Sequence, residues 1–376
     1  MASLKAVLCV VNRVRKQARG ILAHDKTKRR RGQEMMAVNE ADYEIFEAGN
    51  LDLQSGETLR GAKLAYKVHG QLNANKDNVV LFPTFFGGTH TQNEGMIGEG
   101  KALDPSKFFI IVPNMFGNSV SSSPSNAIPP YNRARFPAIS LYDNVSTQHR
   151  LVTEVFGIEK IALVTGWSMG AQQTFQWGCL YPDMVERIVP VCGSAKTSRH
   201  NFVFLEGVKA AITTDSDWAN GSYEKPPLRG LRAMGRVYAG WAVSQAFYRE
   251  EVYLELGYAS LEDYLVDFWE ARRISADAND LLLMIYTWQN ADISDNYLFN
   301  SDFRGALNSI RAKAIVMPGR TDLYFPPEDN EIEVGLMRNA ELRPIESIWG
   351  HLAGGPGFNP VDSKFVDNAL KEILAS

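Results

Sequence analysis

The chain has 376 residues, 45% of them hydrophobic and 22% charged, with a formal net charge of −4 at pH 7. This size predicts one large domain or a domain with an inserted cap, in a globular protein. The longest apolar runs, such as residues 108–112, have the length of a strand, which excludes a membrane span. The three cysteines lack disulfide or zinc spacing, and no glycine-rich phosphate loop appears, so we predict no metal or cofactor.

The charge is distributed unevenly along the chain. Residues 1–31 hold ten Lys or Arg and one acid, which leaves 29 basic and 42 acidic residues in the rest. We interpret residues 1–36 as a basic N-terminal extension: either an organellar targeting segment or an upstream extension with Met35 or Met36 as the functional start. The excess of acidic over basic residues after residue 31 predicts no nucleic-acid binding. We expect a cytoplasmic protein, with mitochondrial targeting by the basic segment as the alternative.

From Tyr43 onward the pattern alternates between short apolar runs and turns. Residues 51–68 predict a hairpin around Ser55-Gly56, and a Ser/Pro/Asn-rich loop covers residues 114–137. The other expected elements are strands at 79–82, 109–112, 161–164 and 188–191, and helices at 141–156 and 169–180. Alternation of strands and helices is typical of a mostly parallel, doubly wound sheet with helices on both faces, an α/β fold.

The alternation stops near Lys196. Residues 197–308 predict helices with aromatic-rich faces, after which a strand at 314–317 resumes the earlier pattern and a helix at 361–374 closes the chain. We therefore expect a core made of residues 41–196 and 309–376, with a helical cap inserted at residues 197–308.

The stretch Gly166-Trp167-Ser168-Met169-Gly170 stands between a predicted strand and a predicted helix. This G-x-S-x-G pattern is typical of a nucleophile elbow, in which a strained turn exposes a serine and the glycines remove clashing side chains. A serine hydroxyl becomes a useful nucleophile only when a positioned base takes its proton. Ser168 is therefore our candidate nucleophile.

The base and the acid are expected later in the chain. His351 lies in a loop between a plausible last strand and the last helix, and Asp322 follows the strand at 314–317. Catalytic groups gather in the loops at the carboxyl ends of parallel strands. We therefore predict His351 as the base and Asp322 as the residue that orients it. We interpret the other candidates as non-catalytic: His200 as a surface or structural residue, Asp329 as a helix-start residue, and Asp292 and Asp295 as cap residues.

Acyl chemistry also needs donors for a developing oxyanion. We predict the backbone N–H of Met169, at the start of the helix after the serine, and that of Phe85, in the loop after the strand at 79–82. Thr84 is the second choice for the latter, and His90 near this loop is interpreted as structural.

With these residues in view, the chain resembles the homoserine O-acetyltransferase-like branch of the α/β-hydrolases from about Tyr43 to its end. The matching stretches are residues 98–104, 112–114, 157–183 and 194–198. The resemblance implies an α/β-hydrolase fold, a triad of Ser168, Asp322 and His351, an acetyl-enzyme on Ser168, and a possible homodimer formed through the cap.

The resemblance leaves the acceptor of the acetyl group open. Transferases of this branch typically carry an aspartate directly after the catalytic histidine, where Leu352 stands here. Arg236 falls on the arginine that receives an amino-acid carboxylate, although an ion pair within the cap explains it equally well. We therefore predict an esterase, close to the short-chain acetate ester hydrolases, acting on small-molecule esters. The alternatives are acetyl transfer from acetyl-CoA to homoserine or another alcohol, and a non-catalytic binding module on the same fold.

Overall fold

Eight strands form one sheet in the order β1-β2-β4-β3-β5-β6-β7-β8. The structure, a computed structural model, describes residues 42–376, so the predicted N-terminal extension lies outside the described residues. The strands are β1 (Glu44–Asp52), β2 (Thr58–His69), β3 (Val79–Leu81), β4 (Phe109–Pro113), β5 (Leu163–Trp167), β6 (Arg187–Val191), β7 (Lys313–Val316) and β8 (Ala340–Leu342).

The strand directions follow the sequence pattern. β1 and β2 form the predicted antiparallel hairpin, and β2 also pairs antiparallel with β4. The remaining neighbours are all parallel. Every residue of β3, β4 and β5 is buried, as expected of strands covered on both faces. The predicted mostly parallel α/β fold is therefore confirmed.

The strand before Ser168 differs from its predicted bounds by more than one residue, whereas β3, β4, β6 and β7 agree with theirs to within one residue at each end. The apolar run at 161–164 predicted the strand before Ser168, whereas β5 runs to Trp167 because residues 164–167 pair with residues 188–191 of β6. Ile161 makes only an isolated bridge with Val185. The strand therefore leads directly into Ser168 without an intervening loop.

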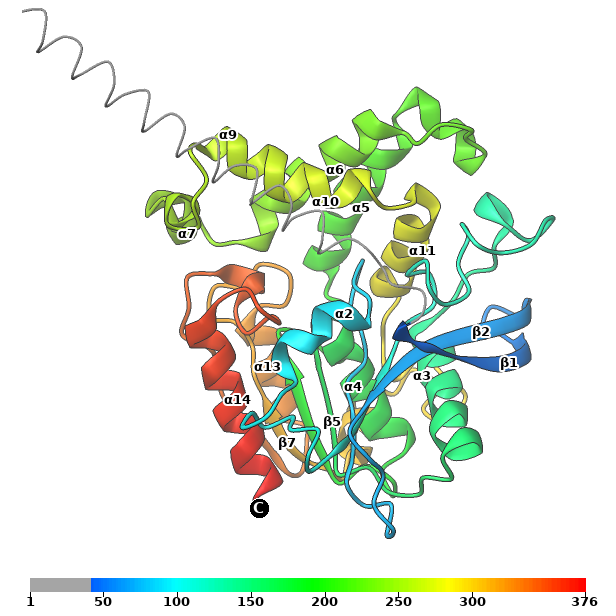
Figure 1. Ribbon diagram of the computed structural model, residues 1–376, viewed down its shortest axis with the longest axis vertical. Helices are drawn as coiled ribbons and strands as arrows, with labels where there is room; N and C mark the ends of the chain where they lie inside the picture. Colours follow the sequence, from blue (N-terminus) through cyan, green and yellow to red (C-terminus); the bar gives the residue numbers. More distant parts are fainter. Residues whose placement is uncertain (1–41) are drawn as a thin grey trace, which may run out of the picture. The chain divides into compact units, whose positions relative to one another are not determined.

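Helices cover both faces of the sheet (Figure 1). On one face α14 contributes Val366 and Leu370 to a core with β5 and β6, and on the other α3, α4 and α12 form a second core. The helices of this part are α2 (His90–Asn93), α3 (Leu141–Arg150), α4 (Met169–Leu180), α12 (Phe303–Ser309), α13 (Pro327–Val334) and α14 (Pro360–Leu374). A π-helical turn (Leu151–Val155) extends α3.

A second group of helices follows β6 and lies together at one end of the sheet (Figure 1). We refer to these as the cap helices. They are α5 (Arg199–Thr213), α6 (Leu228–Ala242), α7 (Gln245–Arg249), α8 (Val252–Glu255), α9 (Leu261–Tyr264), α10 (Ala271–Ile274) and α11 (Ala278–Gln289). They fall within the segment 197–308 for which a cap is predicted. A π-helical turn (Leu265–Glu270) joins α9 to α10.

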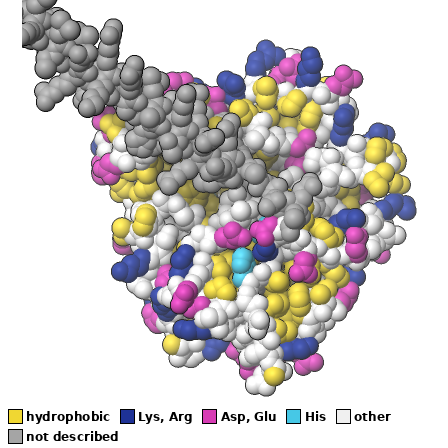
Figure 2. Space-filling model, viewed as in Figure 1, with side chains coloured by type: hydrophobic (Ala, Val, Ile, Leu, Met, Phe, Trp, Pro, Cys, Tyr) yellow, Lys and Arg dark blue, Asp and Glu magenta, His cyan; other side chains and the backbone are white. Residues whose placement is uncertain are grey.

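Acidic and basic side chains are interspersed on the visible face of the molecule, with hydrophobic side chains between them (Figure 2). None of the helices in residues 42–376 is both long and apolar enough to cross a membrane.

Candidate active site

Ser168 stands at a sharp turn between β5 and α4. Its backbone has φ 60° and ψ −125°, a strained conformation for a residue with a side chain, and its N–H donates to the Val191 carbonyl at 2.9 Å. A β-carbon at Gly166 would lie 2.4 Å from the carbonyl carbon of Gly170, and one at Gly170 would lie 2.7 Å from the Pro83 oxygen. Only glycine fits at either position, so the G-x-S-x-G spacing is required by the packing of this turn.

The structure brings the predicted serine, histidine and aspartate into one line of contacts. His351 lies in a 3₁₀ turn (Gly350–Leu352) before α14, and its Nε2 is 2.8 Å from Ser168 Oγ. Its Nδ1 is 2.8 Å from Oδ2 of Asp322, in the loop that follows β7. None of the three residues is more than 3% exposed. A proton on Ser168 Oγ therefore has a shielded path to an imidazole that is itself held by a carboxylate.

The backbone holds the Asp322 carboxylate in a fixed orientation. Its Oδ1 accepts hydrogen bonds from the N–H groups of Tyr324 and Phe325 at 2.8 and 3.2 Å, while Oδ2 faces His351. Both oxygens are satisfied, so the carboxylate is positioned to keep the Nδ1 proton of His351 in place.

Trp167, the residue before Ser168, also positions His351. The two rings stack with centroids 4.8 Å apart and planes 29° from parallel, and Trp167 Nε1 donates to the His351 carbonyl oxygen at 3.1 Å. The edge of Phe85 packs on the same indole at 4.7 Å. The sequence reasoning missed this residue, although a large aromatic side chain inside the G-x-S-x-G stretch was the available signal.

Two backbone donors beside Ser168 are free. Neither the Phe85 N–H nor the Met169 N–H donates to any group within residues 42–376, whereas the Thr84 N–H donates to the Pro113 carbonyl at 3.2 Å. Met169 is the first residue of α4, where backbone N–H groups lack helical partners and the helix dipole is positive. The geometry thus favours Phe85 over Thr84 as the second donor for an oxyanion.

Aromatic side chains from the core and the cap helices meet next to His351. The ring pairs are Tyr324 with His351 at 4.6 Å, Phe86 with Tyr238 at 5.8 Å, and Trp288 with Phe325 at 5.6 Å. Burial raises the pKa of Tyr324 well above its usual value, so its hydroxyl stays protonated and donates to the Tyr238 carbonyl at 3.0 Å. Aromatic rings of Trp167, Tyr324 and Phe325 therefore flank the imidazole beside its Ser168 and Asp322 contacts.

Arg236 does not lie free to bind a substrate carboxylate. Its Nε donates to Glu270 at 2.5 Å, and its terminal nitrogens bind Glu262. The structure thus shows the ion pair within the cap that the sequence left open as the alternative, because two carboxylates use the donors of Arg236. A substrate contact of Arg236 stays a prediction.

The two histidines interpreted as structural lie apart from the Ser168 line of contacts. His200 is exposed on α5 beside Trp241, and His90 is buried at the start of α2. Among the acids, Asp292 pairs with Lys196, and Asp329 lies in the first turn of α13.

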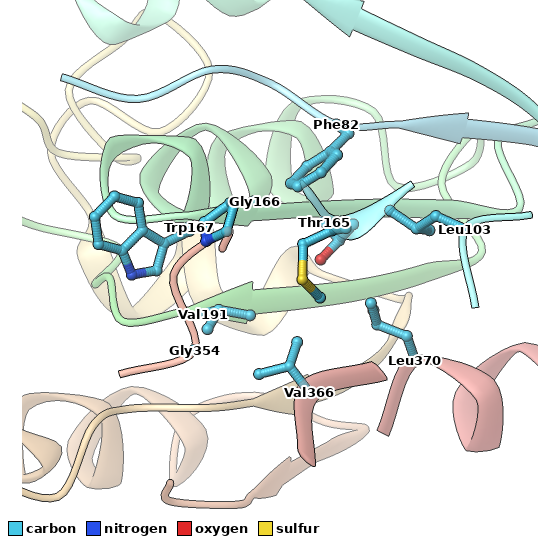
Figure 3. Close-up of a pocket in the computed structure, with 11 residues that line it drawn as sticks. Phe82, Leu103, Thr165, Gly166, Trp167, Val191, Gly354, Val366 and Leu370 are labelled. Atoms are coloured by element: carbon cyan, nitrogen blue, oxygen red, sulfur yellow. The ribbon is translucent and has the colours of Figure 1, made fainter. Parts of the chain in front are cut away.

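A small apolar cavity lies behind the elbow (Figure 3). It is lined on the sheet side by Phe82, Thr165 and Trp167, and on the helix side by Val366 and Leu370 of α14. Ser168, Asp322 and His351 are not among its lining residues. The cavity is therefore a packing gap beneath β5 that borders Trp167, separate from the polar contacts.

Comparison with known proteins agrees with this geometry. A family model described as the alpha/beta hydrolase fold matches residues 77–353. The chain belongs to the α/β-hydrolase family. This α/β-hydrolase is 39% identical to an ethyl acetate hydrolase of Pseudomonas veronii, over 90% of this chain and 97% of that protein. It is 29% identical to a homoserine O-acetyltransferase of Trichormus variabilis, over 80% and 86%.

The solved structure of the acetyl esterase MekB superimposes on this α/β-hydrolase with a TM-score of 0.88 and 39% identity, covering 91% of this chain and 99% of that chain. The resemblance to the homoserine O-acetyltransferase-like branch, and to its acetate ester hydrolases in particular, is thereby confirmed.

Proposed function

We propose that this chain is a serine esterase that cleaves short-chain esters, acetates above all, through an acyl-serine intermediate. The observation that carries the proposal is the buried line of 2.8 Å contacts from Ser168 through His351 to Asp322. The likeness to an ethyl acetate hydrolase and to an acetyl esterase over nine-tenths of the chain supports the substrate class.

Acylation begins when Ser168 Oγ attacks the ester carbonyl carbon while His351 Nε2 takes the hydroxyl proton. The carbonyl oxygen becomes an oxyanion that the N–H groups of Phe85 and Met169 stabilise. Asp322 Oδ2 holds the imidazolium through its Nδ1–H. The imidazolium then gives its proton to the alcohol oxygen as the carbon–oxygen bond breaks, which leaves the acyl group on Ser168.

Deacylation repeats the same two proton transfers, with water in place of Ser168 as the nucleophile and Ser168 Oγ as the leaving oxygen. His351 removes a proton from water as its oxygen attacks the acyl carbonyl, and it returns that proton to Ser168 Oγ when the acyl–serine bond breaks. The products are a carboxylic acid and the free hydroxyl of Ser168.

Water is favoured as acceptor over homoserine because neither of the two groups that the resemblance assigns to amino-acid binding is available here. Leu352, directly after His351, is apolar and 4% exposed, so it offers no carboxylate to an ammonium group. The donors of Arg236 are bound to Glu262 and Glu270.

The aromatic side chains beside His351 support small alkyl groups as substrates. Tyr238 and Trp288 from the cap helices pack against Phe86 at 5.8 and 5.6 Å, which gathers apolar ring surface on the side of the base. We expect acetates to be cleaved faster than esters of long-chain acids.

The test is acetate release from ethyl acetate and butyl acetate, run beside acetyl-CoA plus homoserine, with Ser168→Ala as the blank. We expect ester cleavage by the parent, none by Ser168→Ala, and no homoserine-dependent thiol release. Thiol release that depends on homoserine would replace the hydrolase proposal with acetyl transfer. A folded parent that neither cleaves esters nor is labelled at Ser168 by a serine-reactive phosphonate would favour a binding module.

A further inference from the structure

A second arginine of the cap helices lies against the loop that supplies one oxyanion donor. The guanidinium carbon of Arg273, on α10, is 4.5 Å from the Tyr238 ring centroid and 5.4 Å from that of Phe86. A β-carbon at Gly87 would lie 3.1 Å from Arg273 Nη1, so the guanidinium packs directly on the Gly87 backbone. Gly87 is two residues beyond Phe85. A positive charge is thus built into the wall beside the proposed oxyanion site.

This charge has no counter-ion in the part of the chain that the structure describes. No carboxylate of residues 42–376 pairs with Arg273, and its Nε is shielded from solvent without a hydrogen-bond acceptor. The acid three residues earlier, Glu270, binds Arg236 at 2.5 Å and Arg232 at 3.7 Å instead. Burial lowers the pKa of Arg273, and only the phenols of Tyr238 and Tyr324 oppose that effect.

The ring contacts alone do not account for this placement. A guanidinium over aromatic rings is stabilised. Arg273 is half-buried, however, and its Nε is fully shielded without an acceptor, which costs free energy that a carboxylate partner would offset. Shielded charges in proteins are normally paired, and shielded ionisable groups with perturbed pKa values are common at functional sites. The planar guanidinium matches a carboxylate through two parallel hydrogen bonds.

We propose that Arg273 is an anion-recognition residue and that this esterase prefers esters that carry a carboxylate, which pairs with the guanidinium while the ester carbonyl faces the Phe85 and Met169 N–H groups. This inference rests on the proposed esterase function and names its substrate class more narrowly. The carboxylate can belong to the alcohol part or to the acyl part of the ester, and the test separates these two sources.

The neighbouring Arg272 is a matched control. It stands on the same helix, and its guanidinium lies over Phe268 and Phe358 at 4.1 and 5.4 Å, with an exposed side chain. It shares the charge and the aromatic contacts of Arg273, but none of the distances above brings it to the oxyanion loop.

The experiment compares kcat/KM for two pairs of esters that differ only in charge. The first pair is 3-acetoxypropanoate and 3-acetoxypropanamide, with the charge on the alcohol part. The second is monoethyl succinate and ethyl succinamate, with the charge on the acyl part. In at least one pair we expect the parent to favour the carboxylate about tenfold or more, the ratio given by one charge-assisted hydrogen bond. Arg273→Gln should abolish this preference, Arg273→Lys should retain part of it, and Arg272→Gln should keep it.

Equal rates within both pairs for the parent, or a preference that survives in Arg273→Gln, would overturn the inference. Thermal unfolding and phosphonate labelling of Ser168 establish whether each variant is folded. If Arg273→Gln does not fold, competitive inhibition of the parent by 3-hydroxypropanoate and succinate, against their amides, decides the question. Cleavage of ethyl acetate without a charge preference would reject only the role of Arg273. Failure to cleave any of these esters would reject the esterase proposal itself.

Discussion

Two regions are held together by different kinds of contact: the carboxyl ends of the parallel strands around Ser168, called the sheet edge below, and the cap helices around Tyr238. At the sheet edge, backbone pairing of residues 164–167 with β6 fixes where β5 ends and where α4 begins. In the cap helices, side chains far apart in the chain decide the arrangement, through ring contacts of Tyr238 and the ion pairs of Arg236 with Glu262 and Glu270. Local patterns therefore define the first region, and long-range side-chain partners define the second.

The largest effect is expected from Asp322→Asn at the sheet edge. The asparagine keeps an oxygen for the Tyr324 and Phe325 N–H groups but presents an amide N–H to His351 Nδ1, which forces the wrong tautomer. We expect kcat for ethyl acetate to fall on the order of 10⁴-fold, as for the same change in serine proteases. The measurement is steady-state acetate release, with circular dichroism as the folding control. A loss below about tenfold would contradict the role of Asp322.

The next largest effect is expected at Trp167, whose variants distinguish a role in positioning His351 from a role in core packing alone. Trp167→Leu removes both the stacking on His351 and the hydrogen bond to its carbonyl, whereas Trp167→Phe keeps a ring for stacking. We expect Trp167→Leu to lower kcat about 10²-fold with KM little changed, as a small misplacement of a catalytic group does. Trp167→Phe should recover much of this loss.

Trp177→Phe is the matched control for Trp167. Trp177 is a fully buried tryptophan on α4 whose Nε1 donates to Gln148 at 2.9 Å. Its replacement should lower the free energy of unfolding by about 1–3 kcal/mol and leave kcat unchanged. If the Trp167 and Trp177 variants changed kcat alike, the two tryptophans would both be core residues.

The sheet edge around Ser168 and the cap helices also differ in how far the sequence predicts them. The bounds of α4 match the predicted helix 169–180, and the loops after β7 and β8 bring Asp322 and His351 to Ser168 as expected from their places after strands. Catalysis by these residues is what the Ser168 and Asp322 variants test. The end of β5 was predicted three residues early, because apolar character marks burial while β6 pairing sets the strand end.

The cap helices were predicted only as helices with aromatic faces. The partners of Arg236 stand 26 and 34 residues away, and those of Arg273 include Phe86 from the core, so no periodic pattern links them. The packing of α6, α10 and the π-helical turn between α9 and α10 decides that Arg236 is paired with carboxylates and that Arg273 is not. That information lies in the tertiary structure alone.

A smaller effect concerns a buried polar contact between the cap helices and the core. Asp280, on α11, accepts hydrogen bonds from the N–H and Oγ of Ser125 at 2.9 and 2.6 Å, and burial raises its pKa to about 7. The folded protein therefore retains a proton between pH 4 and 7 that the unfolded chain releases near pH 3.9. The free energy of unfolding consequently falls as pH rises through this window.

Asp280→Asn removes this titration and keeps groups that can bond Ser125. From pH 5 to pH 8 we expect the variant to gain about 1–3 kcal/mol of stability relative to the parent, measured by urea unfolding at both values. Glu224→Gln, which neutralises an exposed acid in the cap segment, should leave the pH dependence of the parent unchanged. Parallel stability curves for Asp280→Asn and the parent would show that Asp280 is already ionised at pH 5.

The smallest effect is expected at Arg236, where the resemblance to transferases implied a substrate contact. Its side chain is 42% exposed, and its donors are bound to Glu262 and Glu270, so Arg236→Gln removes an ion pair of the cap helices and no substrate contact. We expect kcat/KM for ethyl acetate to change less than about threefold and stability to fall by about 1 kcal/mol or less, because Arg232 remains near Glu270 at 3.7 Å. A large rise in KM with unchanged stability would return Arg236 to the substrate site. In that case the ion pair with Glu262 would have to open when an ester binds, and the side-chain partners that distinguish the cap helices from the sheet edge would be exchanged during catalysis.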